Sequence, residues 1–153
     1  MSGVEAAELA NLILVGVLAG NDLGHWSVVH PALGKVPAHE SFTAEKAIFG
    51  RYRYFMPILV PLAIASGIVV AVIGDKSDTS FWLAVAGVSL LGVWQFVVLT
   101  LYPLNERILG AESREPTADE WWALRRSWYA RHTVRVWAGF AAFVLFVLSA
   151  LLA

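Results

Sequence analysis

Four apolar segments, each long enough to cross a lipid bilayer, constrain this chain more than any other feature. A membrane-spanning helix needs about 20 mostly apolar residues to cross roughly 30 Å of hydrocarbon. The segments that meet this requirement are residues 9–29, 54–73, 81–102 and 134–153. Apolar residues make up 58% of the chain and charged residues 15%, which is not the balance of a soluble domain. We therefore predict a multi-pass protein whose first partner is the lipid bilayer.

The same segments predict an all-α membrane fold. Backbone within lipid has to form its hydrogen bonds internally, and the segments lack the polar alternation of membrane strands. A short connection at 74–80 makes the second and third spans antiparallel neighbours. We expect one domain, residues 1–153, folded as an up-down bundle of four transmembrane helices. Thr117 and Glu120 form a capping-box pattern, which predicts that the last helix begins near residue 118.

The basic residues indicate the topology. Of the eleven Lys and Arg residues, all but Lys76 lie in or beside the connections that follow the first and third spans; Arg114 is one of them. Basic residues accumulate on the cytoplasmic side of membrane proteins. We therefore expect both termini on the non-cytoplasmic side of the cell membrane. Because such residues are typical topology anchors, no nucleic-acid partner is expected.

Polar residues interrupt the first span. Asn21 and His25 are four residues apart, and Asp22 precedes His25 by three, so these side chains can share one helical face. An Asp three residues before a His can accept the imidazole N–H and fix its tautomer. Ionisable groups inside a membrane are costly, which favours a functional role for this group. His30 lies five residues after His25, about 140° around an α-helix, unless Pro31 redirects the chain.

A second set of polar residues opens the last span. Arg125, Trp128, His132 and Arg135 recur at spacings of three and four and therefore share one helical face. The third span ends at the same predicted depth, with Asn105 and Glu106. Three separate segments thus bring polar residues to the cytoplasmic end of the bundle. Each histidine taken alone is more typical of a packed or interfacial side chain than of a ligand.

At these positions the chain resembles the fungal anthrone oxygenases and their small four-span relatives. The resemblance rests on three short motifs: Val29-His30-Pro31-Ala32-Leu33, Tyr102-Pro103-Leu104-Asn105, and Trp128 followed by His132 and Arg135. It covers nearly the whole chain. It implies an oxidoreductase-like membrane protein, because some members oxygenate the activated carbon of polycyclic phenols such as anthrones. By motif match it makes Asn105, His132 and Arg135 site residues, whereas the group around His25 is not part of the pattern.

As an enzyme, the protein would oxygenate a hydrophobic aromatic or phenolic substrate near the cytoplasmic end of the bundle. Oxygenation of an acidic C–H needs a base to form the carbanion and a cation to hold the oxyanion. His132 or His25 would serve as the base, and Arg135 with Asn105 as the oxyanion partners. Such a reaction can run without a cofactor.

A metal-dependent version of the enzyme is the alternative mechanism. The neutral imidazoles of His25, His30 and His132, with a carboxylate from Asp22 or Glu106, would hold copper or iron. A haem would need His25 and His132 to face each other across the bundle. Cysteine is absent, which excludes thiolate ligands, disulfides and a cysteine nucleophile.

The non-enzyme alternative is a small transporter or a structural membrane subunit. Gly16, Gly20 and Gly24 recur at spacings of four, a pattern typical of close helix packing and compatible with a homo-oligomer. A transporter would use Asp22 as its proton-coupled acid.

Overall fold

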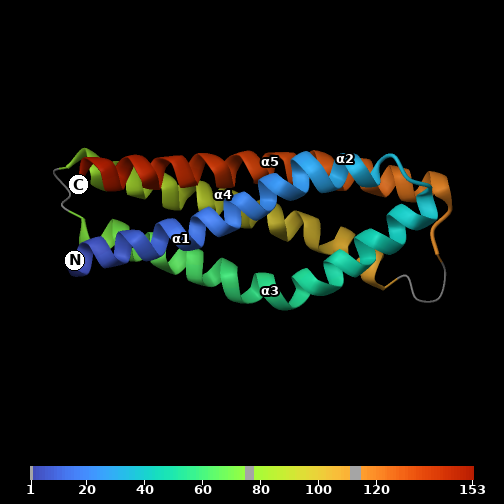
Figure 1. Ribbon diagram of the computed structural model, residues 1–153, viewed down its shortest axis with the longest axis horizontal. Coiled ribbons are helices and arrows are strands. Elements are labelled where there is room, and N and C mark those ends of the chain that lie inside the picture. Colours follow the sequence, from blue (N-terminus) through green and yellow to red (C-terminus); the bar gives the residue numbers. More distant parts are fainter. Residues whose placement is uncertain (1, 75–77, 111–114) are drawn as a thin grey trace.

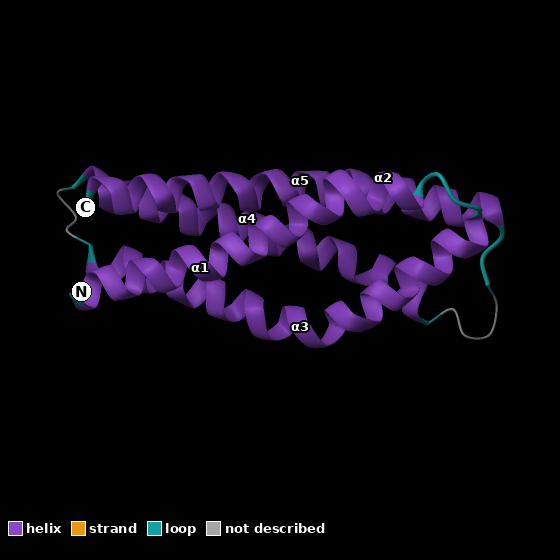
Figure 2. Cartoon of the chain, viewed as in Figure 1, coloured by secondary structure: helices purple, strands orange, loops and turns teal. Residues whose placement is uncertain are grey.

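The computed structural model describes residues 2–74, 78–110 and 115–153, and this part of the chain is helical with short connections (Figure 2). The elements are α1 (Gly3–Gly24), η1 (His25–Val29), α2 (His30–Leu33), α3 (Ala38–Ile73), α4 (Thr79–Leu109) and α5 (Ala118–Leu152). Two basic residues used to predict the topology, Lys76 and Arg114, lie outside the described residues.

Four stretches of helix are long and apolar enough to cross a membrane. They are the continuous stretch Gly3–Leu33, followed by α3, α4 and α5, with 31, 36, 31 and 35 residues. The predicted all-α fold with four long apolar helices is thereby confirmed for the described residues. The N-terminus and the C-terminus lie at the same end of the molecule (Figure 1). The α2–α3 connection, the end of α4 and the start of α5 lie at the opposite end.

Local sequence signals explain where the long helices begin and bend. The Thr117 hydroxyl accepts from the Glu120 N–H, and the Glu120 carboxylate accepts from the Thr117 N–H, which forms a complete capping box before α5. Pro57 and Pro61 lie inside α3 without ending it. In Figure 1, α3 bows away from α5 in its middle part, as prolines in a helix interior predict.

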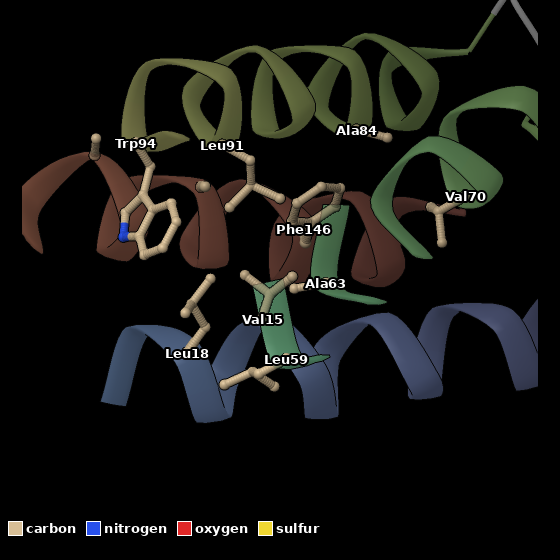
Figure 3. Close-up of a cluster of buried hydrophobic side chains, with 11 residues drawn as sticks. Val15, Leu18, Leu59, Ala63, Val70, Ala84, Leu91, Trp94 and Phe146 are labelled. Carbon is tan, nitrogen blue, oxygen red and sulfur yellow. The ribbon is translucent and has the colours of Figure 1, made fainter. Parts of the chain in front are cut away.

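One hydrophobic cluster fills the end of the bundle that holds the termini. Figure 3 shows Phe146 of α5 between side chains of α1, α3 and α4. Gly67 and Gly87 make room for this ring, because a Cβ added at either position would lie 2.8 Å and 3.0 Å from its atoms. Gly16 similarly faces Phe143, at 3.1 Å, whereas a Cβ at Gly20 or Gly24 would meet open space. The glycines of α1 therefore pack closely within the chain only at Gly16, and the homo-oligomer stays a prediction.

A second hydrophobic cluster fills the opposite end. It comprises Phe42, Phe49, Val97, Leu101, Leu104, Ile108, Trp121 and Trp128. Between the two clusters the buried side chains include charged and polar ones, among them Asp22, His25 and His132. The two apolar clusters thus hold a polar layer between them, where the candidate site lies.

Candidate functional site

The turn of helix that begins at His25 brings two histidines to one side of the chain. On a regular α-helix, residues five apart would point about 140° away from each other. Here η1 is a π-helical turn, in which the His30 N–H donates to the His25 carbonyl. The ring centroids of His25 and His30 consequently lie 4.9 Å apart. Because Pro31 has no N–H to donate, α-helical bonding is already interrupted here, and π turns of this kind are frequent at functional sites.

A third histidine completes a cluster. The ring centroid of His132, from α5, lies 5.6 Å from those of both His25 and His30. One ring nitrogen of each histidine lies within 4.8 Å of the other two. The three residues are 5%, 2% and 0% exposed, and the indole of Trp128 packs against them. We call His25, His30 and His132 the histidine cluster.

Several nitrogens of the histidine cluster have no hydrogen-bond partner among the described residues. They are Nε2 of His25, Nε2 of His30, and both ring nitrogens of His132. Buried polar atoms are nearly always paired, so an unpaired set of this size calls for an explanation.

An ion pair lies directly behind the cluster. Nε of Arg125, from α5, donates to Oε1 of the buried Glu45, from α3, at 3.2 Å. Nη2 of Arg125 donates to Nδ1 of His30 at 2.9 Å and also to the His30 carbonyl. Oε1 of Glu45 lies 3.5 Å from the same Nδ1. Both charged residues therefore position the imidazole of His30.

A second ion pair flanks the other side of the cluster. Nη2 of Arg135 donates to Oδ1 of the fully buried Asp22 at 2.8 Å, and Nε1 of Trp94 donates to Oδ2 at 2.7 Å. The guanidinium also lies over the Trp94 ring, 5.3 Å from its centroid. The partners of Asp22 are thus Arg135 and Trp94, where the spacing in the sequence had suggested His25. Asn21 accepts instead from the Tyr52 hydroxyl, at 3.1 Å.

A cavity of about 280 Å³ adjoins this layer, between α3 and α4. This volume is close to the lower end of the range for small-molecule pockets, about 300–1,000 Å³. Much of its wall is apolar and aromatic, including Phe49, Met56, Val60, Trp94, Val98 and Trp128. Its polar wall includes Asp22, His25, Tyr52, Gln95, Asn105, Glu106 and Arg135.

Three residues of this wall each carry a buried polar atom that has no partner among the described residues. These atoms are His25 Nε2, Gln95 Oε1 and Arg135 Nε. The Oδ1 of Asn105, by contrast, accepts from Trp128 Nε1 at 2.8 Å. The wall of the pocket therefore combines a guanidinium, side-chain amides and an imidazole.

The structure brings most of the sequence-predicted site residues together. Asp22, His25, Asn105, Glu106, Trp128 and Arg135 line the pocket, His30 and His132 belong to the histidine cluster, and Asn21 contacts Tyr52. Sequence reasoning missed Glu45, Tyr52, Trp94 and Gln95. Gln95 carried a usable signal, since it is an amide within an otherwise apolar span. For Glu45 and Trp94 the sequence held no such signal, because their roles depend on their partners.

This arrangement defines a class of protein: a multi-pass helical membrane protein with buried ion pairs and histidines beside an apolar pocket. The family model described as anthrone oxygenase matches residues 46–145, which is more than half of the chain, and the chain belongs to this family. The resemblance read from the sequence is thereby confirmed. The matched segment contains Asn105, His132 and Arg135, whereas Asp22, His25 and His30 precede it. Comparison with curated proteins and comparison with solved structures give no match.

Proposed function

We propose that this protein is a membrane oxygenase that oxidises the activated carbon of a hydrophobic phenol of the anthrone type. The observation that carries the proposal is an apolar, aromatic pocket whose lining residues His25, Gln95 and Arg135 each have a buried polar atom without a partner among the described residues. A phenolic carbon acid offers a hydroxyl that can donate to Gln95 Oε1 and an oxygen that gains negative charge beside Arg135 Nε. Membership of the anthrone oxygenase family supports the reaction class.

The proposed reaction needs no external reductant. A methylene carbon flanked by aromatic rings loses a proton, and the resulting enolate reacts with O₂ to give a hydroperoxide. Loss of the remaining C–H proton breaks the O–O bond and releases water, so R₂CH₂ and O₂ become R₂C=O and H₂O. The two C–H bonding pairs thereby reduce one O₂ molecule.

We assign the first proton transfer to His25 and the oxyanion to Arg135 and Asn105. His25 lines the pocket with Nε2 unpartnered, whereas His132 does not line it. A positioned base typically contributes about 10²–10⁴-fold to the rate. Fixed donors beside a developing oxyanion contribute as much or more in a site shielded from water.

The proposed substrate is lipid-soluble and enters from the bilayer. The pocket is lined mainly from α3 and α4, with residues of α1, η1 and α5, and it reaches the exposed residues Tyr102 and Glu106. With the long connections on the cytoplasmic side of the cell membrane, this pocket lies toward the cytoplasmic face.

We expect a cysteine introduced at Lys35, between α2 and α3, to resist impermeant thiol reagents added to intact cells. Labelling from outside would contradict this orientation.

Oxygen uptake by purified protein tests the proposed function. Protein in detergent is given an anthrone, and O₂ consumption and quinone formation are recorded against a protein-free sample, because anthrones also oxidise spontaneously. We expect one O₂ consumed per quinone, and one ¹⁸O atom from ¹⁸O₂ in the new carbonyl. The matched control is His39→Ala, which alters an exposed histidine outside the pocket. A rate equal to the protein-free background would refute the proposal.

The transporter alternative is less well supported. A proton-coupled acid has to release and rebind its proton during transport. Asp22, the predicted acid, is instead held in an ion pair with Arg135 and accepts from Trp94. This observation favours the enzyme.

A further inference from the structure

The histidine cluster combines features that aromatic packing alone does not require. Its three side chains come from η1, α2 and α5, and each is at most 5% exposed. Their ligand-capable nitrogens all lie within 4.8 Å of one another. Four of their six ring nitrogens are buried without a hydrogen-bond partner among the described residues. Packing against Trp128 accounts for the burial of the rings, but not for four buried ring nitrogens without partners in one cluster.

From this geometry we infer that His25, His30 and His132 bind a single copper ion. Imidazole nitrogens bind copper at roughly 2.0–2.1 Å, the distance known for other imidazole–metal bonds, so the nitrogens would have to close to about 3.5 Å from one another. From a separation of at most 4.8 Å, each pair of nitrogens would close by at most about 1.3 Å, which lies within the range of side-chain rotation. The ligand atoms would be Nε2 of His25, Nε2 of His30 and one nitrogen of His132.

Glu45 is the outer partner that such a site needs. In the structure Nδ1 of His30 accepts from Arg125, which leaves the proton of a neutral imidazole on Nε2. A metal on Nε2 displaces that proton and requires Nδ1 to carry one, so Nη2 of Arg125 would have to give up Nδ1 and keep only its bond to the His30 carbonyl. Oε1 of Glu45, at 3.5 Å, can accept from the new Nδ1–H. Metal ligation by histidine is commonly supported by a carboxylate in this way.

The charge of the surroundings favours copper over other first-row metals. The three ligands are neutral, and the two nearby carboxylates are each paired with an arginine, Glu45 with Arg125 and Asp22 with Arg135. No surplus negative charge is therefore present to offset a buried cation, and the cost of burying an ion rises with the square of its charge. Copper is readily held as a monovalent ion, and as a divalent ion it binds nitrogen ligands most tightly among these metals.

This inference stands apart from the proposed oxygenase activity, because it depends only on the cluster. It also bears on that activity. The proton transfer assigned to His25 applies to the protein without metal. With copper on Nε2, His25 would be a ligand, and the ion would supply Lewis-acid or redox chemistry at the pocket wall in its place. Metal binding is therefore measured directly, without substrate.

Copper titration of the whole protein in detergent tests the site. Purified protein is equilibrated with copper(II) chloride, passed through gel filtration, and assayed for metal content and electron paramagnetic resonance. We expect one copper per chain, with hyperfine splitting from three nitrogens. Outer partners of metal ligands typically contribute about 10–100-fold to affinity, so Glu45→Gln should weaken binding within that range. Alanine at any one histidine of the cluster should weaken binding further.

The variant His39→Ala is the matched control, since His39 is exposed and contacts Glu115 outside the cluster. It should bind copper like the parent protein. If the alanine variants fail to fold, the number of nitrogens that split the copper signal of the parent protein still tests whether three histidines bind the ion. No stoichiometric copper in the parent protein, a spectrum without three nitrogens, or a site that zinc fills in preference to copper would overturn the inference.

Discussion

Replacing Asp22 with alanine is expected to destabilise the protein by about 3–5 kcal/mol, since removing one partner of a buried ion pair leaves the other charge uncompensated. Asp22 is fully buried, and the side chain of Arg135 is only 14% exposed. The substitution also removes the acceptor of the Trp94 N–H. Thermal unfolding in detergent, followed by circular dichroism, measures the loss.

Two further variants separate the ion pair from the loss of side-chain volume. The double variant Asp22→Asn with Arg135→Gln removes both charges and keeps groups able to hydrogen-bond. It should recover most of the stability lost in Asp22→Ala, because no unpaired charge is left behind. Asp119→Ala, at an exposed acid near the start of α5, should change stability by less than about 1 kcal/mol. An Asp22→Ala protein as stable as that control would contradict the role given to the ion pair.

The same double variant is expected to lower turnover of an anthrone by about 10²–10³-fold, the usual effect of removing one oxyanion donor. Arg135 is the proposed cation for the enolate oxygen, because its side chain lines the pocket and its Nε has no partner among the described residues. Its Nη2 is committed to Asp22. Neutralising both residues removes the cation without leaving a buried carboxylate unpaired. The double variant should therefore fold, and its kcat can be measured.

Arg131→Gln is the control for this experiment. Arg131 lies one turn before Arg135 on α5, is exposed, and donates to the Thr100 carbonyl. Its substitution should leave turnover unchanged. If the double variant keeps the melting temperature and the turnover of the parent protein, Arg135 does not stabilise the oxyanion.

Much of the fold could be predicted from the sequence because its signals are local. The length of each apolar segment predicted four membrane-crossing helices, and the Thr117–Glu120 capping box marked the start of α5. The bend in α3 likewise has a local cause, the interior prolines Pro57 and Pro61. These features depend on residues close together in the chain, and a single sequence displays them directly.

The candidate site could be predicted only in part. The polar residues of the first, third and fourth spans pointed to one end of the bundle, and most of them line the pocket. The α-helical spacing of His25 and His30 argued that they diverge, but the π turn of η1 brings them together. The partners of Asp22 were wrongly anticipated from its spacing to His25, because Trp94 and Arg135 reach it from other helices.

By itself, then, the sequence determined which segments are helical and apolar enough to cross a membrane, and which of them carry the costly polar residues. Only the tertiary structure decided how those residues meet. The rotation of each helix about its axis and the packing between helices bring His25, His30 and His132 together. The same two factors place Glu45 beside Arg125. That rotation is set by contacts between residues far apart in the chain, such as Phe146 against Gly67 and Gly87, and local periodicity does not encode them.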